Sequence, residues 1–331
     1  SQARRRTSGP PLIVRLIAYG LLIFLAVKVG TMAWEAVEAR RAGLSQDEGQ
    51  VEIPFQRLPV LKGEQDGWLD SSLAAVVDAA VDRSDGVSSV YVKSLNTGAS
   101  VAIQDDRVVP SASLFKVPIL VEVLRQQRLG SFDMDTPVRL QQKHWSDGAG
   151  VLQAQIGKEF PVRELLELMI GVSDNVAALA LLDLVKTDNV NLTLQSAGLE
   201  VTRLRIGDVS GDWGGRPGEN TTSAREMGIL LEKIATGKIL DDAASQEAIR
   251  LLSLEQQAAW LPALLPPRAR VAHKSGELPG VRHDAGVIYT PRNQFVAVVL
   301  VSDLTDFERA ARTIAQVARA AYDYFETGKR K

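Results

Sequence analysis

The sequence has no cysteine, and only three of its 331 residues are histidine. Without cysteine the chain can form no disulfide, no thiolate nucleophile and no metal site that depends on sulfur ligands. His144, His273 and His283 lie too far apart in the sequence to suggest a metal-binding motif, so we expect a structural role for each. We predict neither a metal nor a cofactor.

The chain also has no large excess of charge of either sign. Its formal net charge is −2 at pH 7, whereas nucleic-acid-binding proteins usually carry a basic face or stripe. We therefore expect no nucleic-acid partner. Hydrophobic residues make up 45% and charged residues 24% of the sequence, as in an ordinary globular protein with a sizeable core.

One long apolar segment is present, at residues 11–34. Arg15 and Lys28 interrupt it, but each can extend its charge toward one membrane interface, so the segment is long enough to cross a bilayer. The arginines at positions 4–6 predict a cytoplasmic amino terminus and a membrane-anchored large domain on the extracytoplasmic side, in the cell envelope. The alternative is secretion after cleavage of a signal peptide, although Trp34 suits an interfacial anchor better.

Strand patterns lie at both ends of the remaining sequence, and helical patterns lie between them. Residues 87–104 alternate around an Asn-Thr-Gly turn, which predicts a hairpin of two strands. The apolar residues of 306–326 recur at helical spacing, which predicts a helix across the sheet. Further strands are predicted at 270–275, 283–290 and 294–302, and further helices at 68–86, at 114–128 and through most of 160–235. A Gly-rich loop at 207–222 is predicted to interrupt the last helical region.

This order of elements predicts an α/β fold of the α+β type, with an antiparallel sheet flanked by terminal helices and an inserted all-α domain. Such a fold brings the two ends of the domain together in one sheet. The expected boundaries are 1–34 for a cytoplasmic tail and membrane anchor, 35–67 for a linker, 68–326 for the folded domain and 327–331 for a tail. The α/β part of the folded domain is expected at 68–115 and 237–326, and the all-α part at 116–236.

Three short motifs follow one another in this domain, and they are Ser113-x-x-Lys116, Ser173-Asp174-Asn175 and Lys274-Ser275-Gly276. A Ser-x-x-Lys motif occurs by chance about once in a chain of this length, so alone it carries little weight. All three motifs in this order are improbable by chance. Together they form a set that acts in the serine-based opening of amides.

Each motif also has a structural explanation. Ser113 could cap a helix while the Lys116 side chain extends to solvent. The Ser-Asp-Asn motif could be the cap of the helix that follows it, because an apolar run begins at Val176. Lys274 could be a surface lysine on a strand.

With these motifs the chain resembles the serine β-lactamases of class A and their penicillin-binding relatives, over about residues 69–326. The stretch SGELPGVRHDAGVIY is similar to the wider set of β-lactamase-like serine hydrolases. The resemblance implies an α/β domain made from both chain ends, an inserted all-α domain and an active site between them. The substrates that it implies are a small-molecule β-lactam or a D-Ala-D-Ala-like peptide.

A serine hydroxyl is a weak nucleophile unless a base lies beside it. Because no histidine is suitably placed, Lys116 is the candidate base for Ser113, and a spacing of three residues along a helix brings the two side chains within contact range. Lysine acts as a base only if its pKa falls, and burial next to Lys274 would lower the pKa of Lys116. We predict Ser113 as the nucleophile and Lys116 as its base.

The resemblance implies roles for four further side chains. Ser173 would pass a proton to the leaving nitrogen, and Lys274 would tune Ser173 and attract a substrate carboxylate. Asn175 would bind a substrate amide carbonyl, and Ser275 would contact the substrate carboxylate.

The oxyanion hole of such a site consists of backbone N–H groups, here those of Ser113 and Glu277. Gly276 would let the substrate backbone approach the strand closely. Arg282 falls where related enzymes place an arginine that binds a carboxylate, and its planar guanidinium suits that task. The alternative for Arg282 is an ion pair with Asp284 or another acid.

The chain departs from the true lactamases in one loop. Where those enzymes have a glutamate that activates the deacylating water, this sequence has Asp208. Aspartate is one methylene shorter, and a general base must lie within roughly 3 Å of its water, so Asp208 could serve only if the loop shifts inward. The sequence therefore predicts complete acylation machinery and leaves the group that activates the water open.

The leading hypothesis is a serine hydrolase of the class A β-lactamase type, which hydrolyses β-lactam amides through a covalent acyl-enzyme on Ser113. The first alternative is a penicillin-binding DD-peptidase that acts on cell-wall peptides and deacylates slowly because the loop glutamate is missing. The second alternative is a non-enzymatic envelope protein that keeps the fold, and the intact motifs argue against it.

Overall fold

The computed structural model of the chain describes residues 68–205 and 220–327. The predicted membrane anchor, the predicted linker and Asp208 lie outside the described residues. None of the helices in the two described ranges combines the length and the apolar composition that a bilayer-spanning helix needs.

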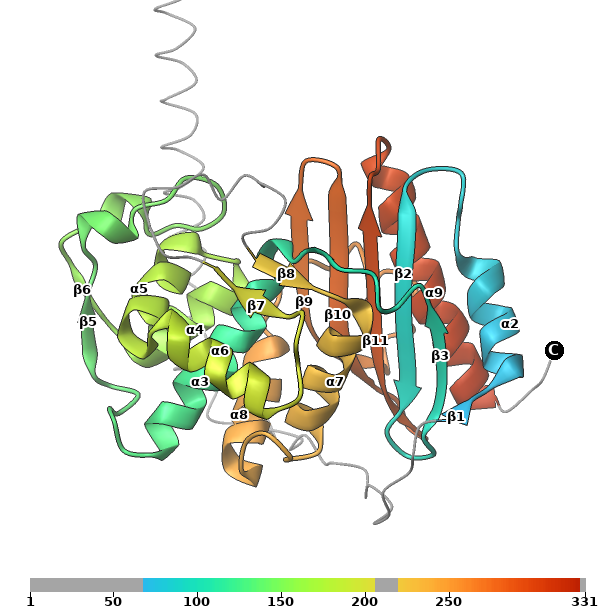
Figure 1. Ribbon diagram of the computed structural model, residues 1–331, viewed down its shortest axis with the longest axis horizontal. Coiled ribbons are helices and arrows are strands. Elements are labelled where there is room, and N and C mark those ends of the chain that lie inside the picture. Colours follow the sequence, from blue (N-terminus) through green and yellow to red (C-terminus); the bar gives the residue numbers. More distant parts are fainter. Residues whose placement is uncertain (1–67, 206–219, 328–331) are drawn as a thin grey trace, which may run out of the picture. The chain divides into compact units, whose positions relative to one another are not determined.

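The centre of the fold is a six-stranded sheet in the order β1-β3-β2-β11-β10-β9 (Figure 1). β1 runs parallel to β3, and the other neighbouring strands are antiparallel. The predicted antiparallel sheet and its hairpin are confirmed, and strands from the two ends of the domain, β2 and β11, lie side by side. The strands are β1 Trp68–Leu69, β2 Val87–Ser94, β3 Ala99–Ile103, β9 Arg270–Leu278, β10 Val281–Tyr289 and β11 Gln294–Ser302.

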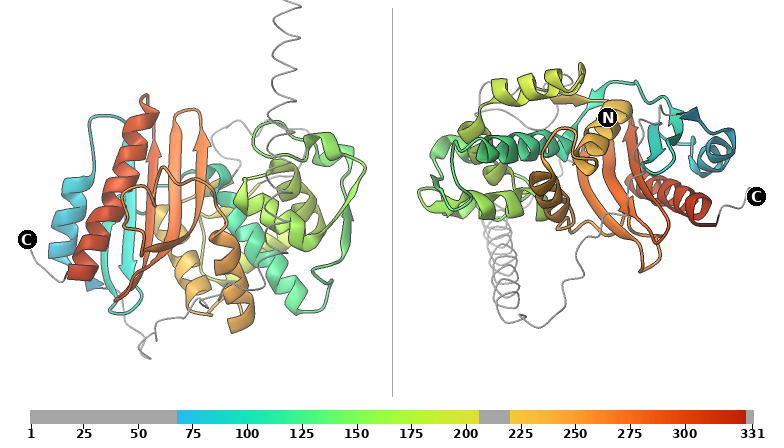
Figure 2. Two further views of the ribbon diagram at one scale, coloured as in Figure 1. Left: turned by 180° about the vertical axis from the view of Figure 1, so that it is seen from behind. Right: turned by 90° about the horizontal axis from the view of Figure 1, so that it is seen from below.

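Helices α2 and α9 cover one face of this sheet (Figure 2). α9, Phe307–Thr327, confirms the helix predicted at 306–326, and its apolar stripe is buried in the core between helix and strands. Ile314 and Val317 of this stripe have no exposed surface.

α2, Ser71–Ala80, begins later and ends earlier than the helix predicted at 68–86. Trp68 and Leu69 pair with β3 and therefore belong to the sheet. Asp70 then accepts hydrogen bonds from the backbone N–H groups of Ser72 and Leu73, which defines the start of the helix. A two-residue strand has no periodicity of its own, so only its pairing with β3 identifies it.

On its opposite side the sheet contacts α7 and, at β9, α8 and η1, and the other helices lie farther from the sheet (Figures 1 and 2). The region predicted to be helical through 160–235 is mostly helical, but it also contains the short strands β7 and β8. β7 lies where a helix is predicted, and β8 lies at the end of the loop predicted at 207–222; β8 pairs with both β7 and β4, so tertiary pairing decides the structure of both segments. The helices are α3 Lys116–Arg128, α4 Val162–Gly171, α5 Asn175–Val185, α6 Thr187–Ser196, α7 Ala224–Ala235 and α8 Asp242–Leu252, with 3-10 helices η1 Ala112–Phe115, η2 Gln142–His144 and η3 Gln153–Gln155; the remaining strands are β4 Val109–Pro110, β5 Pro137–Arg139, β6 Glu159–Pro161, β7 Arg203–Leu204 and β8 Asn220–Thr222.

α7 packs closely on β2 because Gly228 has no side chain. A Cβ atom at Gly228 would lie 2.2 Å from Cδ1 and 2.6 Å from Cε1 of Tyr91, far inside normal contact distance. The Tyr91 ring is itself buried, so it has little room to move away.

We expect Gly228→Ala to lower the free energy of unfolding by about 1–3 kcal/mol, because the added methyl group must displace the Tyr91 ring. In a Tyr91→Ala background the same substitution should be neutral or stabilising, since alanine favours the helix over glycine. Urea unfolding of the four proteins measures both effects. Equal losses in the two backgrounds would contradict the close packing of α7 on β2.

Candidate active site

The segment that carries Ser113 begins with a strained turn. Ser113 lies in η1, and α3 follows directly from Lys116. The sequence predicts a single helix from residue 114, whereas the structure has the tighter 3-10 helix first. Ala112 has a φ of +46°, a left-handed conformation that is uncommon for alanine. This turn leads the chain from β4 into η1 and so sets the direction of the Ser113 backbone.

Three other predicted residues meet at the amine of Lys116. Its Nζ atom lies 3.3 Å from Oγ of Ser113. It lies 2.5 Å from the backbone O of Ser173, 2.9 Å from Oγ of Ser173 and 2.8 Å from Oδ1 of Asn175, and a neutral amine can donate to two of these three oxygens. Lys116 has no exposed surface, so the alternative in which its side chain extends to solvent is wrong.

The pKa of Lys116 is well below the ordinary value of lysine. Burial is the main cause, and the positive charge of Lys274 lowers the pKa further. Asp174 and Glu255 act in the opposite direction without restoring the ordinary value. A larger share of this amine is therefore neutral than in an exposed lysine, and a neutral amine can accept the Ser113 proton.

The Ser-Asp-Asn motif is both a helix cap and a part of the site. Oδ1 of the buried Asp174 accepts the backbone N–H of Ala177 at 2.8 Å, at the start of α5. Its Oδ2 accepts the N–H groups of Val151 at 2.6 Å and Leu152 at 3.0 Å, which holds the preceding loop. Ser173 has a φ of +56°, and in this conformation both its carbonyl and its hydroxyl oxygen reach the lysine amine.

Gly276 allows β9 to approach η1. A Cβ atom at this position would lie 3.0 Å from Cβ of Ala112 and 3.1 Å from the backbone N of Ser113. The resemblance implies that Gly276 makes room for substrate, and the structure adds that it makes room for the backbone of Ser113 itself. This close approach is what brings the third motif to the first.

Among the described residues β9 is an edge strand, and no strand of that part of the chain pairs with one side of its backbone. The N–H of Ser275 points to that side, because it contacts Oε2 of Glu255 at 3.3 Å. Backbone N–H directions in a strand repeat every second residue, so the N–H of Glu277 points to the same side. The Ser113 backbone lies beside Gly276. This arrangement is compatible with the predicted oxyanion hole of two backbone N–H groups.

Lys274 is buried and pairs with a carboxylate that sequence reasoning missed. Its Nζ donates to Oε2 of Glu255 and to the backbone O of Ser275 at 3.2 Å. Glu255 follows α8, and its side chain is only 5% exposed. The one signal available in the sequence was that a buried lysine needs an opposite charge, and the sequence offers 40 acidic residues to choose from. The alternative of a surface lysine on a strand is wrong.

The comparison with known proteins agrees with this geometry. A model of the "Beta-lactamase enzyme family" matches residues 70–325, which is most of the chain. The chain belongs to the β-lactamase enzyme family. The predicted resemblance, the mixed α/β fold and the assignment as a serine hydrolase are thereby confirmed.

Individual members of the family align over most of their length. Beta-lactamase L2 of Stenotrophomonas maltophilia is 28% identical over 261 residues, which are 76% of this chain and 86% of that protein. The β-lactamase of Streptomyces albus G is 30% identical over 273 residues, which are 75% of this chain and 82% of that protein. The structure of PBP-A matches with a TM-score of 0.71 and 29% identity, over 78% of this chain and 98% of that chain. An acyl-enzyme complex of a PBP-A mutant with penicillin G also has a TM-score of 0.71, with 28% identity over 79% of this chain and 98% of that chain.

Arg282 does not join the other predicted residues of this family member. Its guanidinium donates to Oε2 of Glu277 at 2.7 Å and to the backbone O of Phe307 at 2.6 Å, and its Cζ lies 4.8 Å from the ring centre of Trp260. The side chain therefore points to the α9 side of the sheet. The ion-pair alternative describes these contacts better than an anchor for substrate, although the acid is Glu277 and not Asp284.

Asn175 and Ser275 both have partners within the protein. Nδ2 of Asn175 donates to the backbone O of Asp147 at 3.0 Å, while its Oδ1 accepts from the Lys116 amine. Oγ of Ser275 donates to Oε2 of Glu255 at 3.1 Å. Their predicted roles in binding substrate stay predictions, and the structure shows which internal contacts a substrate would have to share or replace.

His283 connects the sheet to the segment before Ser113. Its Nδ1 accepts the backbone N–H of Val301 at 3.2 Å, and its Nε2 lies 2.9 Å from the backbone O of Pro110. Burial lowers the pKa of His283 to about 4. A neutral ring with one acceptor and one donor nitrogen fits both contacts, which gives His283 a positioning role for η1.

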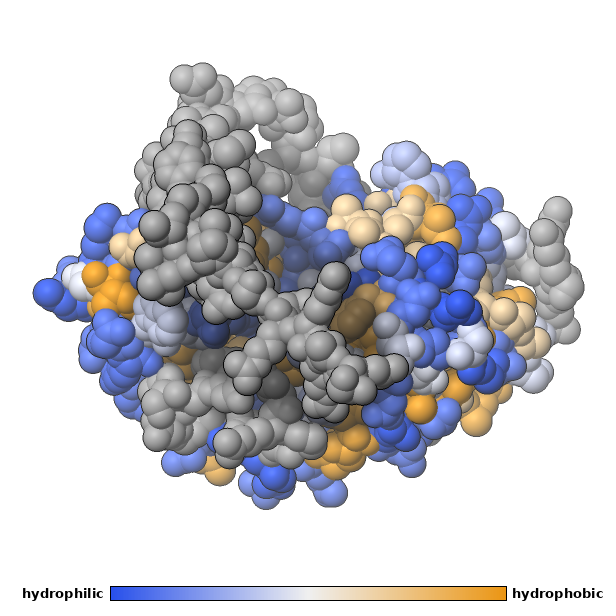
Figure 3. All heavy atoms as spheres, turned by 90° about the horizontal axis from the view of Figure 1, so that it is seen from above, coloured by the Kyte–Doolittle hydropathy of each residue, from blue (hydrophilic) through white to orange (hydrophobic). Residues whose placement is uncertain are grey.

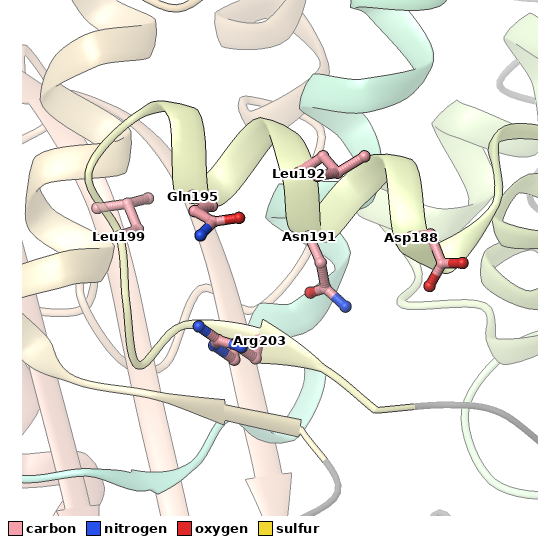
Figure 4. A pocket seen from close by; sticks show the side chains of 6 residues that line it. All are labelled: Asp188, Asn191, Leu192, Gln195, Leu199 and Arg203. Atoms are coloured by element: carbon pink, nitrogen blue, oxygen red, sulfur yellow. The ribbon is translucent and has the colours of Figure 1, made fainter.

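The rest of the described surface adds no residue to this site. Hydrophilic and hydrophobic residues are mixed on the described part of the face in Figure 3. Within 68–205 and 220–327, no group of His, Asp and Glu side chains is arranged to hold a metal ion. A pocket beside α6 contains no residue of the three motifs (Figure 4); its lining residues are Asp188, Asn191, Leu192, Gln195, Leu199 and Arg203.

We expect the free energy of unfolding of the wild-type protein to rise with pH relative to that of Lys116→Met. The folded state disfavours the charged amine, so between the lowered pKa of Lys116 and the ordinary pKa of lysine the unfolded chain binds one proton more than the folded protein. The stability that this group removes is regained as pH rises, by up to ~1.4 kcal/mol per pH unit. Urea unfolding between about pH 7 and about pH 9 measures this difference.

The control is Lys158→Met, which changes an exposed lysine in the same way. Its stability should follow the wild-type pH dependence. If the stability of Lys116→Met did so as well, the lowered pKa of Lys116 would be refuted.

Proposed function

We propose that this chain opens β-lactam amides by forming a covalent acyl-enzyme on Ser113. The observation that carries the proposal is the buried Lys116 amine, 3.3 Å from Oγ of Ser113, with its pKa lowered. The relatives named as β-lactamases support the reaction class, and the acyl-enzyme complex of the PBP-A mutant with penicillin G supports the covalent step.

The acylation step follows from the contacts of Lys116. The neutral amine takes the proton of the Ser113 hydroxyl as Oγ attacks the lactam carbonyl carbon. A C–O bond forms, and the negative charge that develops on the carbonyl oxygen accepts hydrogen bonds from the N–H groups of Ser113 and Glu277. Both donors belong to backbone held in place by the close approach of β9 to η1 at Gly276.

Collapse of this intermediate breaks the C–N bond, and the leaving nitrogen needs a proton. Oγ of Ser173 lies 2.9 Å from the lysine Nζ, so it can receive a proton from Lys116 while giving its own to the nitrogen. The net result is an ester on Ser113, a protonated leaving nitrogen and a neutral lysine. Hydrolysis of the ester then requires an activated water, for which Asp208 remains the sequence-based candidate.

A penicillin-binding DD-peptidase with slow deacylation is the second candidate function. It is favoured by the similarity to PBP-A and by the aspartate at position 208, where the resemblance implies a glutamate. The two functions share the acylation step on Ser113. They differ in the lifetime of the ester.

We also propose that the domain works on the extracytoplasmic side, as a membrane-anchored protein. The apolar segment at 11–34 and the arginines at 4–6 support this location. Alkaline extraction of membranes from cells that make the full chain is the test. Retention in the membrane fraction is expected, and release into the soluble fraction would overturn the anchor.

We expect benzylpenicillin to form an adduct on Ser113 within seconds, and Lys116→Met to slow its formation by about 10²–10⁴-fold because the base is lost. Time-resolved mass spectrometry of the intact full chain measures the adduct, and peptide mapping locates it. An adduct that decays within minutes, with turnover of a chromogenic cephalosporin, supports the lactamase. An adduct that persists for hours, with release of D-alanine from a model peptide, supports the peptidase.

Ser113→Ala is the negative control, and Lys158→Met is the matched control that should acylate like the wild type. No adduct on the wild-type protein, or an undiminished rate in Lys116→Met, would overturn the proposal.

A further inference from the structure

At the unpaired edge of β9, a carboxylate of the protein itself accepts hydrogen bonds from Lys274 and Ser275. Oε2 of Glu255 accepts hydrogen bonds from Nζ of Lys274, from Oγ of Ser275 at 3.1 Å and from the backbone N–H of Ser275 at 3.3 Å. The Glu255 side chain is 5% exposed and the Lys274 side chain is not exposed at all. One ammonium, one hydroxyl and one backbone N–H thus converge on a single carboxylate oxygen.

The same donors are those that a substrate carboxylate would need. Lys274 and Ser275 are the two residues to which the resemblance assigns that task. Nζ of Lys274 also contacts the backbone O of Ser275, so two of its three N–H donors are already used. A second carboxylate at this position would meet the charge of the first, and juxtaposed like charges strongly disfavour binding.

The charge state of Glu255 fits this arrangement. Burial alone would raise the pKa of Glu255, but the charge and hydrogen bond of Lys274 outweigh burial and hold the pKa below its ordinary value. Glu255 is therefore an anion at neutral pH.

We propose that Glu255 determines substrate specificity by holding the anion position of the active site. Acyl donors that carry a carboxylate there must displace Glu255 from Lys274 and Ser275. Acyl donors that are uncharged at the same place, such as esters or amides of that carboxylate, avoid this competition. The inference rests on the proposed function, because it concerns acyl donors of Ser113.

A purely structural role for Glu255 makes a different prediction. A buried lysine needs a counter-charge, and removal of the partner destabilises the fold. If neutralising Lys274 were the whole role of Glu255, Glu255→Gln would change stability and would affect charged and uncharged acyl donors equally. The ratio of the two acylation rates therefore separates specificity from stability.

The test compares benzylpenicillin with its methyl ester as acyl donors of the full chain. We expect Glu255→Gln to raise the ratio of the second-order acylation rates, acid over ester, by about tenfold or more, because glutamine keeps a hydrogen-bond acceptor but no charge. Glu247→Gln is the matched control, since Glu247 lies on α8 and pairs with Arg250. An unchanged or lowered ratio in Glu255→Gln would overturn the proposal.

A measurement on the wild-type protein needs no variant that could misfold. The wild-type enzyme should react with the ester at least as fast as with the acid. A preference for the acid by about tenfold or more would show that Glu255 does not compete with the substrate carboxylate.

Equilibrium binding separates this inference from the proposed function. We expect benzylpenicillin to bind Ser113→Ala/Glu255→Gln about tenfold more tightly than Ser113→Ala, as measured by NMR titration, with no such gain for the ester. Tighter binding without acylation of the wild-type chain would support Glu255 as the specificity residue and refute the acyl-enzyme. Equal binding to both proteins would refute the role of Glu255 even if Ser113 is acylated.

Discussion

A lysine amine without access to solvent governs the arrangement of this domain. Lys116 can be buried because acceptors from a second segment surround Nζ, namely the carbonyl and hydroxyl oxygens of Ser173 and the amide oxygen of Asn175. The backbone adopts a left-handed conformation at Ser173 to present these groups. Burial in turn lowers the pKa of Lys116, which makes the amine suitable as a base for Ser113. Core packing and reaction chemistry thus depend on the same atom.

The charges around this amine form a balanced set. Lys274 lies close enough to lower the pKa of Lys116, and Glu255 provides the counter-charge that allows Lys274 to be buried. Glu255 belongs to the segment that follows α8, so the third motif is completed by a residue far from any motif. The same carboxylate fills a position that the chemistry of the site reserves for an anion. The Glu255–Lys274 ion pair is therefore part of both the stability of the fold and the proposed selection of substrates by charge.

Sequence reasoning succeeded where local pattern decides the structure. The short runs rich in Val and Ala of β10 and β11 and the apolar stripe of α9 identify these elements without knowledge of their partners. It was wrong for β7, which is a strand only because it pairs with β8, and it predicted a loop where β8 pairs with β4 and β7. It was also wrong about the start of α2, because Trp68 and Leu69 are recruited by β3. Pairing between distant segments leaves no trace in the periodicity of such short strands.

The sequence by itself determined the order of the three motifs, the family to which they point and the candidate pair of Ser113 and Lys116. It could do so because a spacing of three residues brings two side chains together through local geometry alone. Only the tertiary structure decided that Glu255 pairs with Lys274, that Arg282 turns toward α9, and that Gly276 brings β9 against Ser113. These contacts join segments that are far apart in the chain, and the register of the sheet and the packing at its edge set their geometry.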